Sequence, residues 1–221
     1  GNVVVSMEGT IIATWGTSHV RARRSEDGGQ TWGPDIVIAK PGFQPGGITV
    51  NEANGDIIAF VEDRHPPAPI HVYVSSDDGK TWNKIETNIK PDSKGNDPSM
   101  HMNEHGITLR HGKHKDRLIR PSRWYAGQNH SSKWPQHYTN AIYSDDGGKS
   151  WKTSKPFPEN GTGEAALVEL ADALAAGTGL RATEAAASES GKLENLFEAT
   201  GPLVRGTHDL SLDVERNKLN L

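Results

Sequence analysis

The sequence predicts an all-β protein of the β-propeller type, and three observations support this prediction. An eight-residue pattern, Ser-x-Asp-x-Gly-x-(Thr/Ser)-Trp, recurs at residues 25–32, 75–82 and 144–151. Short runs rich in Ile, Val, Thr and aromatic residues, bounded by Gly, Asn, Asp and Pro, precede each copy. The copies begin 50 and 69 residues apart, and four strands in each unit of about 40–50 residues are typical of a propeller blade.

Three antiparallel units of four strands are therefore expected between residues 2 and 155. Strands of the first unit are predicted at 2–6, 9–15, 18–25 and 35–40. The second unit is predicted within 46–63, 69–76 and 83–88, and the third within 104–111, 116–125 and 138–144. The extra length of the third unit lies in two expected loops, 91–106 and 125–136.

The repeated pattern itself is interpreted as a structural turn. The carboxylates of Asp27, Asp77 and Asp146 are expected to accept backbone hydrogen bonds within their own turns. Glycine in the pattern supplies a backbone conformation that other residues resist. The ring of the final tryptophan packs into the blade, so the residues predicted to be substantially buried are Trp32, Trp82 and Trp151.

Composition excludes several classes of function. The chain of 221 residues has a formal net charge of -4, so it lacks the basic excess with which proteins neutralise nucleic-acid phosphates. No apolar run approaches the ~18 residues that would span a bilayer. The chain has no cysteine, which excludes disulfides and thiolate metal ligands. No signal peptide is visible, the sequence does not fix the compartment, and the first residue, Gly1, suggests that the natural beginning is missing.

The last part of the sequence departs from the propeller pattern. Residues 165–190 contain ten alanines in 26 positions, and alanine favours helix over strand. We therefore divide the chain into propeller blades over 1–170 and a divergent, irregular or helical segment over 171–221. Three blades and part of a fourth do not close a ring, and open blade edges favour association with other copies.

The repeats resemble the Asp-boxes of the sialidase (neuraminidase) superfamily, and residues 2–170 resemble its bacterial exo-sialidase-like members. Further similar phrases are VRARRSEDGGQTWGPDIVIA, HGITLRHGKHKDRLIRPSRWY and, after the third repeat, GTGEAALVEL. The resemblance implies a six-bladed propeller, of which three to four blades are present here, with the active site at one mouth of the ring. It also implies hydrolysis of terminal sialosides without a cofactor, and full-length members are often secreted or periplasmic.

The family's catalytic residues match this chain only in part. The resemblance implies a Tyr nucleophile that is activated by a Glu, an Asp that acts as the acid, and three arginines that bind the sugar carboxylate. Glu164, in GTGEA, matches the Glu, and Arg181 has the spacing of the second arginine. The Tyr, the first arginine and the usual acid Asp have no counterpart at matching positions, and Asp63 is a candidate replacement for the acid.

Two clusters add candidate ligands for an acidic sugar. VEDRHPPAP brings Glu62, Asp63, Arg64 and His65 to the end of a strand, either as a sugar site or as a local salt bridge. RPSRWYAG supplies Arg120, Arg123 and Tyr125, a cationic and aromatic group that fits either anionic sugars or packing. The histidines at 101, 105, 111 and 114 are interpreted as hydrogen-bonded loop residues, and no metal site is predicted.

Two functions remain open from the sequence. The first is a sialidase-family glycoside hydrolase acting on a sialoside or another acidic glycan, with weak or no activity in the chain as given. The second is a non-catalytic carbohydrate-binding or scaffold propeller that has the repeats and lacks the arginine clamp. Neither function involves nucleic acid or a membrane span.

Overall fold

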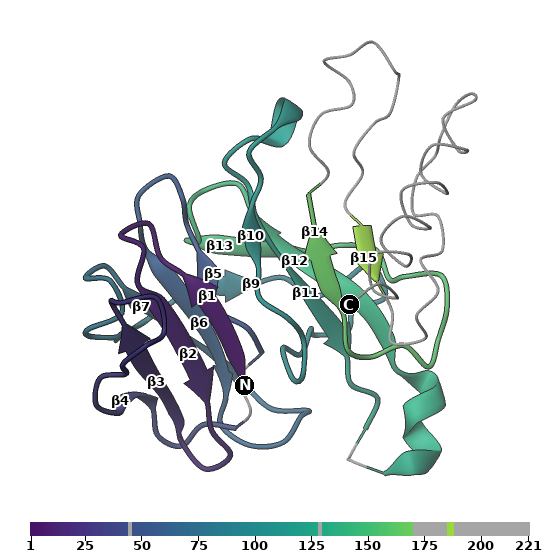
Figure 1. The fold of residues 1–221 in the computed structure, drawn as a ribbon. Coiled ribbons are helices and arrows are strands. Elements are labelled where there is room, and N and C mark those ends of the chain that lie inside the picture. Colours follow the sequence, from purple (N-terminus) through teal and green to yellow (C-terminus); the bar gives the residue numbers. More distant parts are fainter. Residues whose placement is uncertain (44–45, 128–129, 170–184, 188–221) are drawn as a thin grey trace, which may run out of the picture.

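The computed structural model describes residues 1–43, 46–127, 130–169 and 185–187, and these are mostly β-strands and loops (Figure 1). The first antiparallel sheet contains β1 (Asn2–Val5), β2 (Ile11–Trp15), β3 (Val20–Ser25) and β4 (Ile36–Ala39). The second contains β5 (Thr49–Val50), β6 (Ile57–Glu62), β7 (Ile70–Ser75) and β8 (Asn83–Ile85). The third contains β10 (Ile107–Thr108), β11 (Leu118–Trp124), β12 (Tyr138–Ser144) and β13 (Ser150–Thr153).

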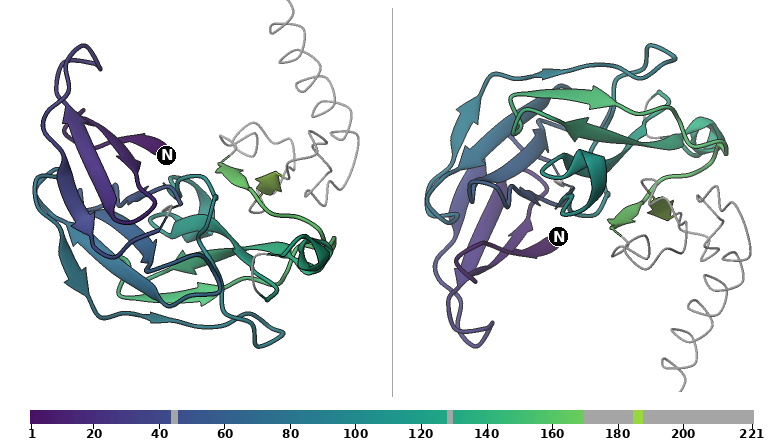
Figure 2. Two further views of the ribbon diagram at one scale, coloured as in Figure 1. Left: turned by 90° about the horizontal axis from the view of Figure 1, so that it is seen from below. Right: turned by 90° about the horizontal axis from the view of Figure 1, so that it is seen from above.

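The expected three four-stranded antiparallel units are therefore confirmed, with one addition. A short strand, β9 (Asn88–Ile89), pairs in parallel with the outer edge of β13. This pairing links the segment after the second repeat to the third sheet. The innermost strands contact in turn, because β5 touches β1 on one side and β10 on the other. Figure 2 shows the three sheets following one another around an arc, as blades do in a propeller.

Two hydrophobic cores lie between neighbouring sheets, and β6 contributes to both. Its residues alternate, as the two-residue period of a strand requires. Ile57, Ala59 and Val61 face the core shared with the first sheet, and Ile58 and Phe60 face the core shared with the third. All six residues of β6 are consequently buried. The sequence IIAFVE is apolar on both faces because the second sheet is sandwiched between the others.

The three repeat turns, residues 25–32, 75–82 and 144–151, have the same hydrogen-bond pattern. In the second, Oδ1 of Asp77 accepts from Ser75 Oγ at 2.8 Å and from the Thr81 amide at 2.8 Å, and Oδ2 accepts from Thr81 Oγ1 at 2.7 Å. Asp27 and Asp146 make the equivalent bonds in their own turns. The expectation that these carboxylates bind backbone N–H groups is confirmed.

The tryptophans of the repeat turns differ in burial. Trp151 is fully buried against Phe60 of the second sheet, with ring centroids 4.9 Å apart, and Trp82 packs into the core between the first and second sheets. The prediction that Trp32 is also buried is wrong, since it is 40% exposed. Trp151 and the partly buried Trp82 each pack on the sheet before their own, and no sheet precedes β1 among the described residues.

The first sheet also presents exposed apolar side chains. Val3, Val5, Met7 and Val37 are each more than half exposed, and with Trp32 they are the large exposed apolar residues of this sheet and its turns. Such residues are normally covered when another layer packs on a sheet.

At the other end of the described chain, β14 (Ala166–Val168) pairs antiparallel with β15 (Ala185–Ala187) and contacts β11. The expectation of an irregular or helical segment over 171–221 is therefore wrong at 185–187, where three alanines form a strand. Pairing with β14 overrides the helical preference of alanine there. The remainder of 171–221 lies outside the described residues.

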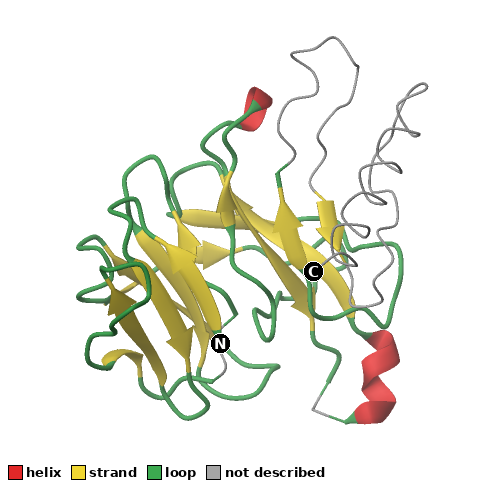
Figure 3. Ribbon diagram, viewed as in Figure 1, coloured by secondary structure: helices red, strands yellow, loops and turns green. Residues whose placement is uncertain are grey.

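The two ends of the sheets carry different features. The repeat turns follow β3 and β7 and connect β12 to β13, so they lie at one end, near the short helix η1 (Gly112–His114) between β10 and β11. β2, β6 and β11 terminate at the opposite end, here called the mouth end, together with η2 (Ser131–Gln136) between β11 and β12. Figure 3 shows the two short helices in red at opposite ends of the sheets.

Candidate functional site

The candidate site is a pocket at the mouth end, with a volume of about 530 Å³. We call it the histidine pocket. It is lined by Phe43, His65, His101, Met102, Arg123, Tyr125, Trp134, His137 and the segment 161–164. A neighbouring cavity of about 470 Å³ reaches the first sheet at Trp15, Thr17 and Arg21, and it shares Met102 and Glu164 with the histidine pocket. Glu164 therefore lies where the two cavities meet.

Strand ends bring these residues together. His65 follows β6, Arg123 lies near the end of β11, Tyr125 comes directly after it, and His137 immediately precedes β12. Because β6 and β11 run toward the mouth end and β12 runs away from it, all four side chains gather at the same edge of the sheets. The second and third sheets thus contribute to one pocket.

Glu164 is positioned by the loop before β10. The Glu104 amide donates to the Ala165 carbonyl at 2.9 Å, and the Ala165 amide donates to Asn103 Oδ1 at 3.2 Å. Both bonds fix Ala165 and thereby hold the adjacent Glu164 at the pocket wall. The preceding Gly163 is packed against Arg123, because a Cβ atom at that position would lie 2.5 Å from Nη1 of the arginine. A larger residue at 163 would displace the guanidinium.

Aromatic rings form the floor of the histidine pocket. The Tyr125 ring lies 5.1 Å from His65 and 4.2 Å from His137 between centroids, and the Arg123 guanidinium lies 4.7 Å from the Tyr125 ring centre. His101 stacks on Phe43 at 5.4 Å and lies 5.0 Å from His65. Tyr125 is only 5% exposed, so the rings hold one another in place.

Hydrogen bonds define the tautomer of neutral His65. Nδ1 lies 2.8 Å from the Pro66 carbonyl oxygen, which can only accept, so Nδ1 carries the proton. Nε2 then accepts from the Tyr125 hydroxyl at 3.4 Å. A phenol is thus paired with an imidazole base, and that base is oriented by a third group.

The surroundings of His137 favour its neutral form. Burial lowers the pKa of its imidazole, the positive charge of Arg123 lowers it further, and a hydrogen bond to the Ala126 backbone acts in the opposite direction. The residue is 4% exposed, and its Nε2 has no hydrogen-bond partner among the described residues. At neutral pH this nitrogen therefore presents a lone pair.

A buried charge cluster lies beneath the pocket. Burial raises the pKa of Glu62 to about 7, although a hydrogen bond from Ser99 and the charges of Arg120 and Arg123 oppose this rise. Ser99 and Arg123 also exchange both backbone hydrogen bonds, at 2.6 and 3.0 Å. Glu62 and Ser99 therefore brace the strand that carries Arg123.

The other predicted site residues lie elsewhere. Arg120 is fully buried between the second and third sheets, with its guanidinium 5.0 Å from the Phe60 ring centre, and it does not line the pocket. Asp63 and Arg64 form an ion pair with each other at 2.9 Å, which is the local salt bridge considered from the sequence. Arg181 lies outside the described residues. Glu164, Arg123, Tyr125 and His65, which belongs to the VEDRHPPAP cluster, are the candidates from the sequence that line the histidine pocket.

Of the three pocket histidines, His65 was a candidate from its VEDRHPPAP cluster, whereas His101 and His137 were not expected in the site. Among the four clustered histidines only His101 lines the pocket, where its ring lies beside that of His65, which is distant in sequence. The positions of His65 and His137 relative to the predicted strands could have indicated that these two residues lie together. His65 follows one predicted strand, and His137 precedes another at the same end of the sheets.

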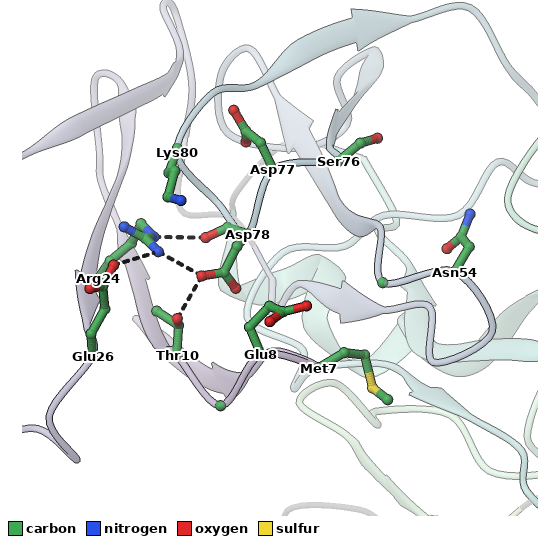
Figure 4. Close-up of a pocket in the computed structure, with 12 residues that line it drawn as sticks. Met7, Glu8, Thr10, Arg24, Glu26, Asn54, Ser76, Asp77, Asp78 and Lys80 are labelled. Carbon is green, nitrogen blue, oxygen red and sulfur yellow. Dashed lines mark hydrogen bonds and ion pairs between the residues drawn. The ribbon is translucent and has the colours of Figure 1, made fainter.

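A second cavity of about 530 Å³ lies among the repeat turns of the first two sheets (Figure 4). Three of its charged side chains, Arg24, Glu26 and Asp78, are joined in one network. Arg24 Nη2 lies 2.6 Å from Asp78 Oδ2, which also accepts from Thr10 Oγ1 at 2.6 Å, and Glu26 lies 2.9 Å from the same nitrogen of Arg24. This network joins the first two sheets, and we assign it a structural role.

Known proteins are similar to this chain in sequence and fold. The Sortilin-Vps10 family model, described as Sortilin, neurotensin receptor 3, matches residues 21–161. A protein described as Sialidase from Micromonospora viridifaciens is 30% identical over 199 residues, covering 78% of this chain and 30% of that protein. The structure of Hadza microbial sialidase Hz136 has a TM-score of 0.55 at 22% identity, covering 75% of this chain and 38% of that one.

A further structural neighbour has a different printed activity. It is an N-acetylgalactosamine deacetylase from F. plautii in complex with blood group B trisaccharide, with a TM-score of 0.52 at 16% identity, covering 77% of this chain and 58% of that one.

The present chain spans less than a third of the length of the Micromonospora viridifaciens sialidase. No helix in the part of the chain that the structure describes is long and apolar enough to cross a membrane.

Proposed function

Because this chain belongs to the Sortilin-Vps10 family and, more broadly, to the sialidase-like superfamily, we propose that its mouth end binds carboxylated sugars as part of a sialidase-family glycoside hydrolase. The observation that carries the proposal is the convergence of Arg123, Tyr125 and Glu164 on one pocket. An arginine recognises a carboxylate through two parallel hydrogen bonds, and aromatic rings pack against the apolar faces of a sugar. Sialic acid is a sugar of this kind.

The proposed roles follow from chemistry and position. Arg123 binds the sugar carboxylate, Tyr125 contacts the ring, and Glu164 is the carboxylate proton acceptor. Asp63, the candidate acid, is only partly exposed and bonded to Arg64, so it would have to leave that ion pair in order to reach a leaving oxygen. A glycan complex of a structural neighbour, the F. plautii enzyme with blood group B trisaccharide, supports a carbohydrate ligand for this fold.

We expect the chain as given to hydrolyse sialosides slowly or not at all. At the positions that match the family's motifs, the sequence has no counterpart of the nucleophilic Tyr, the first arginine or the usual acid Asp. Catalytic groups that act as a unit lose far more activity together than a simple sum would suggest. The alternative, a non-catalytic carbohydrate-binding propeller, makes the same prediction for turnover but requires binding.

Two measurements test the proposal. Titration calorimetry with N-acetylneuraminic acid is expected to show binding that Arg123→Gln weakens, because the carboxylate loses its charge partner. Turnover of a fluorogenic sialoside is measured beside Glu164→Gln. Clear turnover that disappears in Glu164→Gln would overturn the expectation of low activity. Absence of binding to any carboxylated sugar would overturn the proposed function itself.

A further inference from the structure

The histidine pocket holds an acid and a base that sialoside hydrolysis by Glu164 does not use. The base is Nε2 of His137, which has no hydrogen-bond partner among the described residues although the side chain is almost entirely buried at the pocket wall. A buried polar atom without a partner is costly, which suggests that a ligand group completes it.

The acid is the Tyr125 hydroxyl. One group near it is Nε2 of His65, at 3.4 Å, and the other nitrogen of that ring lies 2.8 Å from the Pro66 carbonyl oxygen. The contact of 3.4 Å is long for a hydrogen bond to a hydroxyl, so a substrate oxygen at a shorter distance would compete with His65 for the proton. The rings of Tyr125 and His137 lie 4.2 Å apart between centroids, which places the acid and the base on one small region of the pocket.

The third element is a cation beside this pair. The guanidinium of Arg123 lies 4.7 Å from the Tyr125 ring centre and also lines the pocket. A carboxylate bound by an arginine loses much of its negative charge, which makes the hydrogen on the adjacent carbon more acidic. A base, an acid and a carboxylate-binding cation are the groups needed to remove a proton next to a carboxylate.

We propose that the histidine pocket catalyses β-elimination on 4-linked uronic acids, with His137 as the base, Tyr125 as the acid and Arg123 as the carboxylate ligand. This inference rests on the proposed function, since it needs a carboxylated sugar in the same pocket. It changes the substrate class from a sialic acid to a uronic acid.

The step balances without a further reactant. Nε2 of His137 takes the proton from C5, and the electron pair of that C–H bond forms the C4–C5 double bond. The bond between C4 and the glycosidic oxygen breaks, and its electron pair leaves on the oxygen. The Tyr125 hydroxyl gives its proton to that oxygen, and Arg123 stabilises the negative charge that develops on the carboxylate. Solvent then returns a proton to Tyr125 and removes one from His137.

Elimination requires fewer chemical groups than hydrolysis. Hydrolysis requires a nucleophile at the anomeric carbon and an acid at the leaving oxygen, and sialic acid binding in the family involves three arginines. Elimination requires no nucleophile, and a single cation is sufficient to stabilise the negative charge that develops on the carboxylate. The neutral state of His137, which its lowered pKa favours, is also the state that a base needs.

The test uses the full chain with polygalacturonate, hyaluronan and alginate, which together present both configurations at C4 and at C5. Elimination creates a conjugated double bond, so product is measured by ultraviolet absorbance and by mass spectrometry, which also detects the added water of a hydrolysis product. We expect at least one polymer to yield the unsaturated product. Tyr125→Phe and His137→Gln should each lower the rate by about 10²–10⁴-fold.

Matched controls separate chemistry from folding. Tyr125→Phe removes only a hydroxyl and keeps the packed ring, and Tyr143→Phe makes the same change in β12 outside the pocket and should leave the rate unchanged. Calorimetry with each polymer measures binding independently. Binding without unsaturated product, or product that persists in both Tyr125→Phe and His137→Gln, overturns the elimination proposal alone. Absence of binding to every polymer and to N-acetylneuraminic acid overturns the proposed function as well.

Discussion

Replacing Asp77 by alanine removes the acceptor at the centre of the second repeat turn. Three hydrogen bonds are lost, from the Ser75 hydroxyl, the Thr81 amide and the Thr81 hydroxyl. Burial alone would raise the pKa of Asp77, but the hydrogen bonds from Thr81 and Ser75 outweigh it and lower the pKa to about 2. The fall from 3.8 limits the electrostatic part to about 2 kcal/mol, and solvent screening reduces it because the side chain is exposed.

We therefore expect Asp77→Ala to lower the free energy of unfolding by about 1–2 kcal/mol, similar to the loss of a helix N-cap. For a protein of this size that corresponds to about 2–8 °C in melting temperature. Urea unfolding and differential scanning calorimetry measure the change. Asp97→Ala serves as the control and should have little effect. Asp97 is also an exposed aspartate, but it lies outside the repeat turns, in the segment between β9 and β10.

The pH dependence provides a second check on the same variant. A carboxylate whose pKa is lowered in the folded state stabilises the protein above its unfolded pKa, and this contribution disappears as the pH falls through the folded pKa. The difference between the parent and Asp77→Ala should therefore be full above pH 4 and vanish toward pH 2. An Asp77→Ala protein that melts with the parent at neutral pH would show that the carboxylate does not stabilise the turn.

Three further predictions concern the sheets. Trp151→Ala should cost about 3–5 kcal/mol because the ring is fully buried, whereas Trp32→Ala should cost under about 1 kcal/mol, as urea unfolding would show. The raised pKa of Glu62 predicts that the free energy of unfolding falls by up to about 3 kcal/mol as the pH rises from 4.5 to 7. Glu62→Gln should remove this pH dependence. Equal pH profiles of the parent and Glu62→Gln would show that Glu62 is not its source. Self-association through the first sheet should appear in sedimentation velocity at high concentration and weaken in Val5→Lys; an unchanged profile would exclude that surface.

The sequence predicted what depends on local pattern. The repeat turns, their carboxylate hydrogen bonds and the three four-stranded sheets follow from residues close together in the chain. Trp32 was mispredicted because its burial depends on a neighbouring sheet and not on its own turn. Residues 185–187 were mispredicted because pairing with β14 overrides alanine's preference for helix.

The site was predictable only where a motif carried it. Glu164, Arg123 and Tyr125 lie in recognisable phrases, and all three line the histidine pocket. His65 and His137 are 72 positions apart, and only the direction of the strands brings them to Tyr125. Arg120 and Arg123 share one phrase, yet they point to opposite faces of β11, since successive strand residues alternate.

The repeat turns and the histidine pocket lie at opposite ends of the same strands. Mutations in the mouth loops can therefore change the ligand or the reaction while the turns continue to hold the sheets together. Selection can act on the two ends separately, so the repeats alone carry little information about the chemistry at the mouth end. A glycan deacetylase can share this fold with sialidases for that reason. For an engineer, the same separation means that substrate preference can be altered through the mouth loops without redesigning the turns.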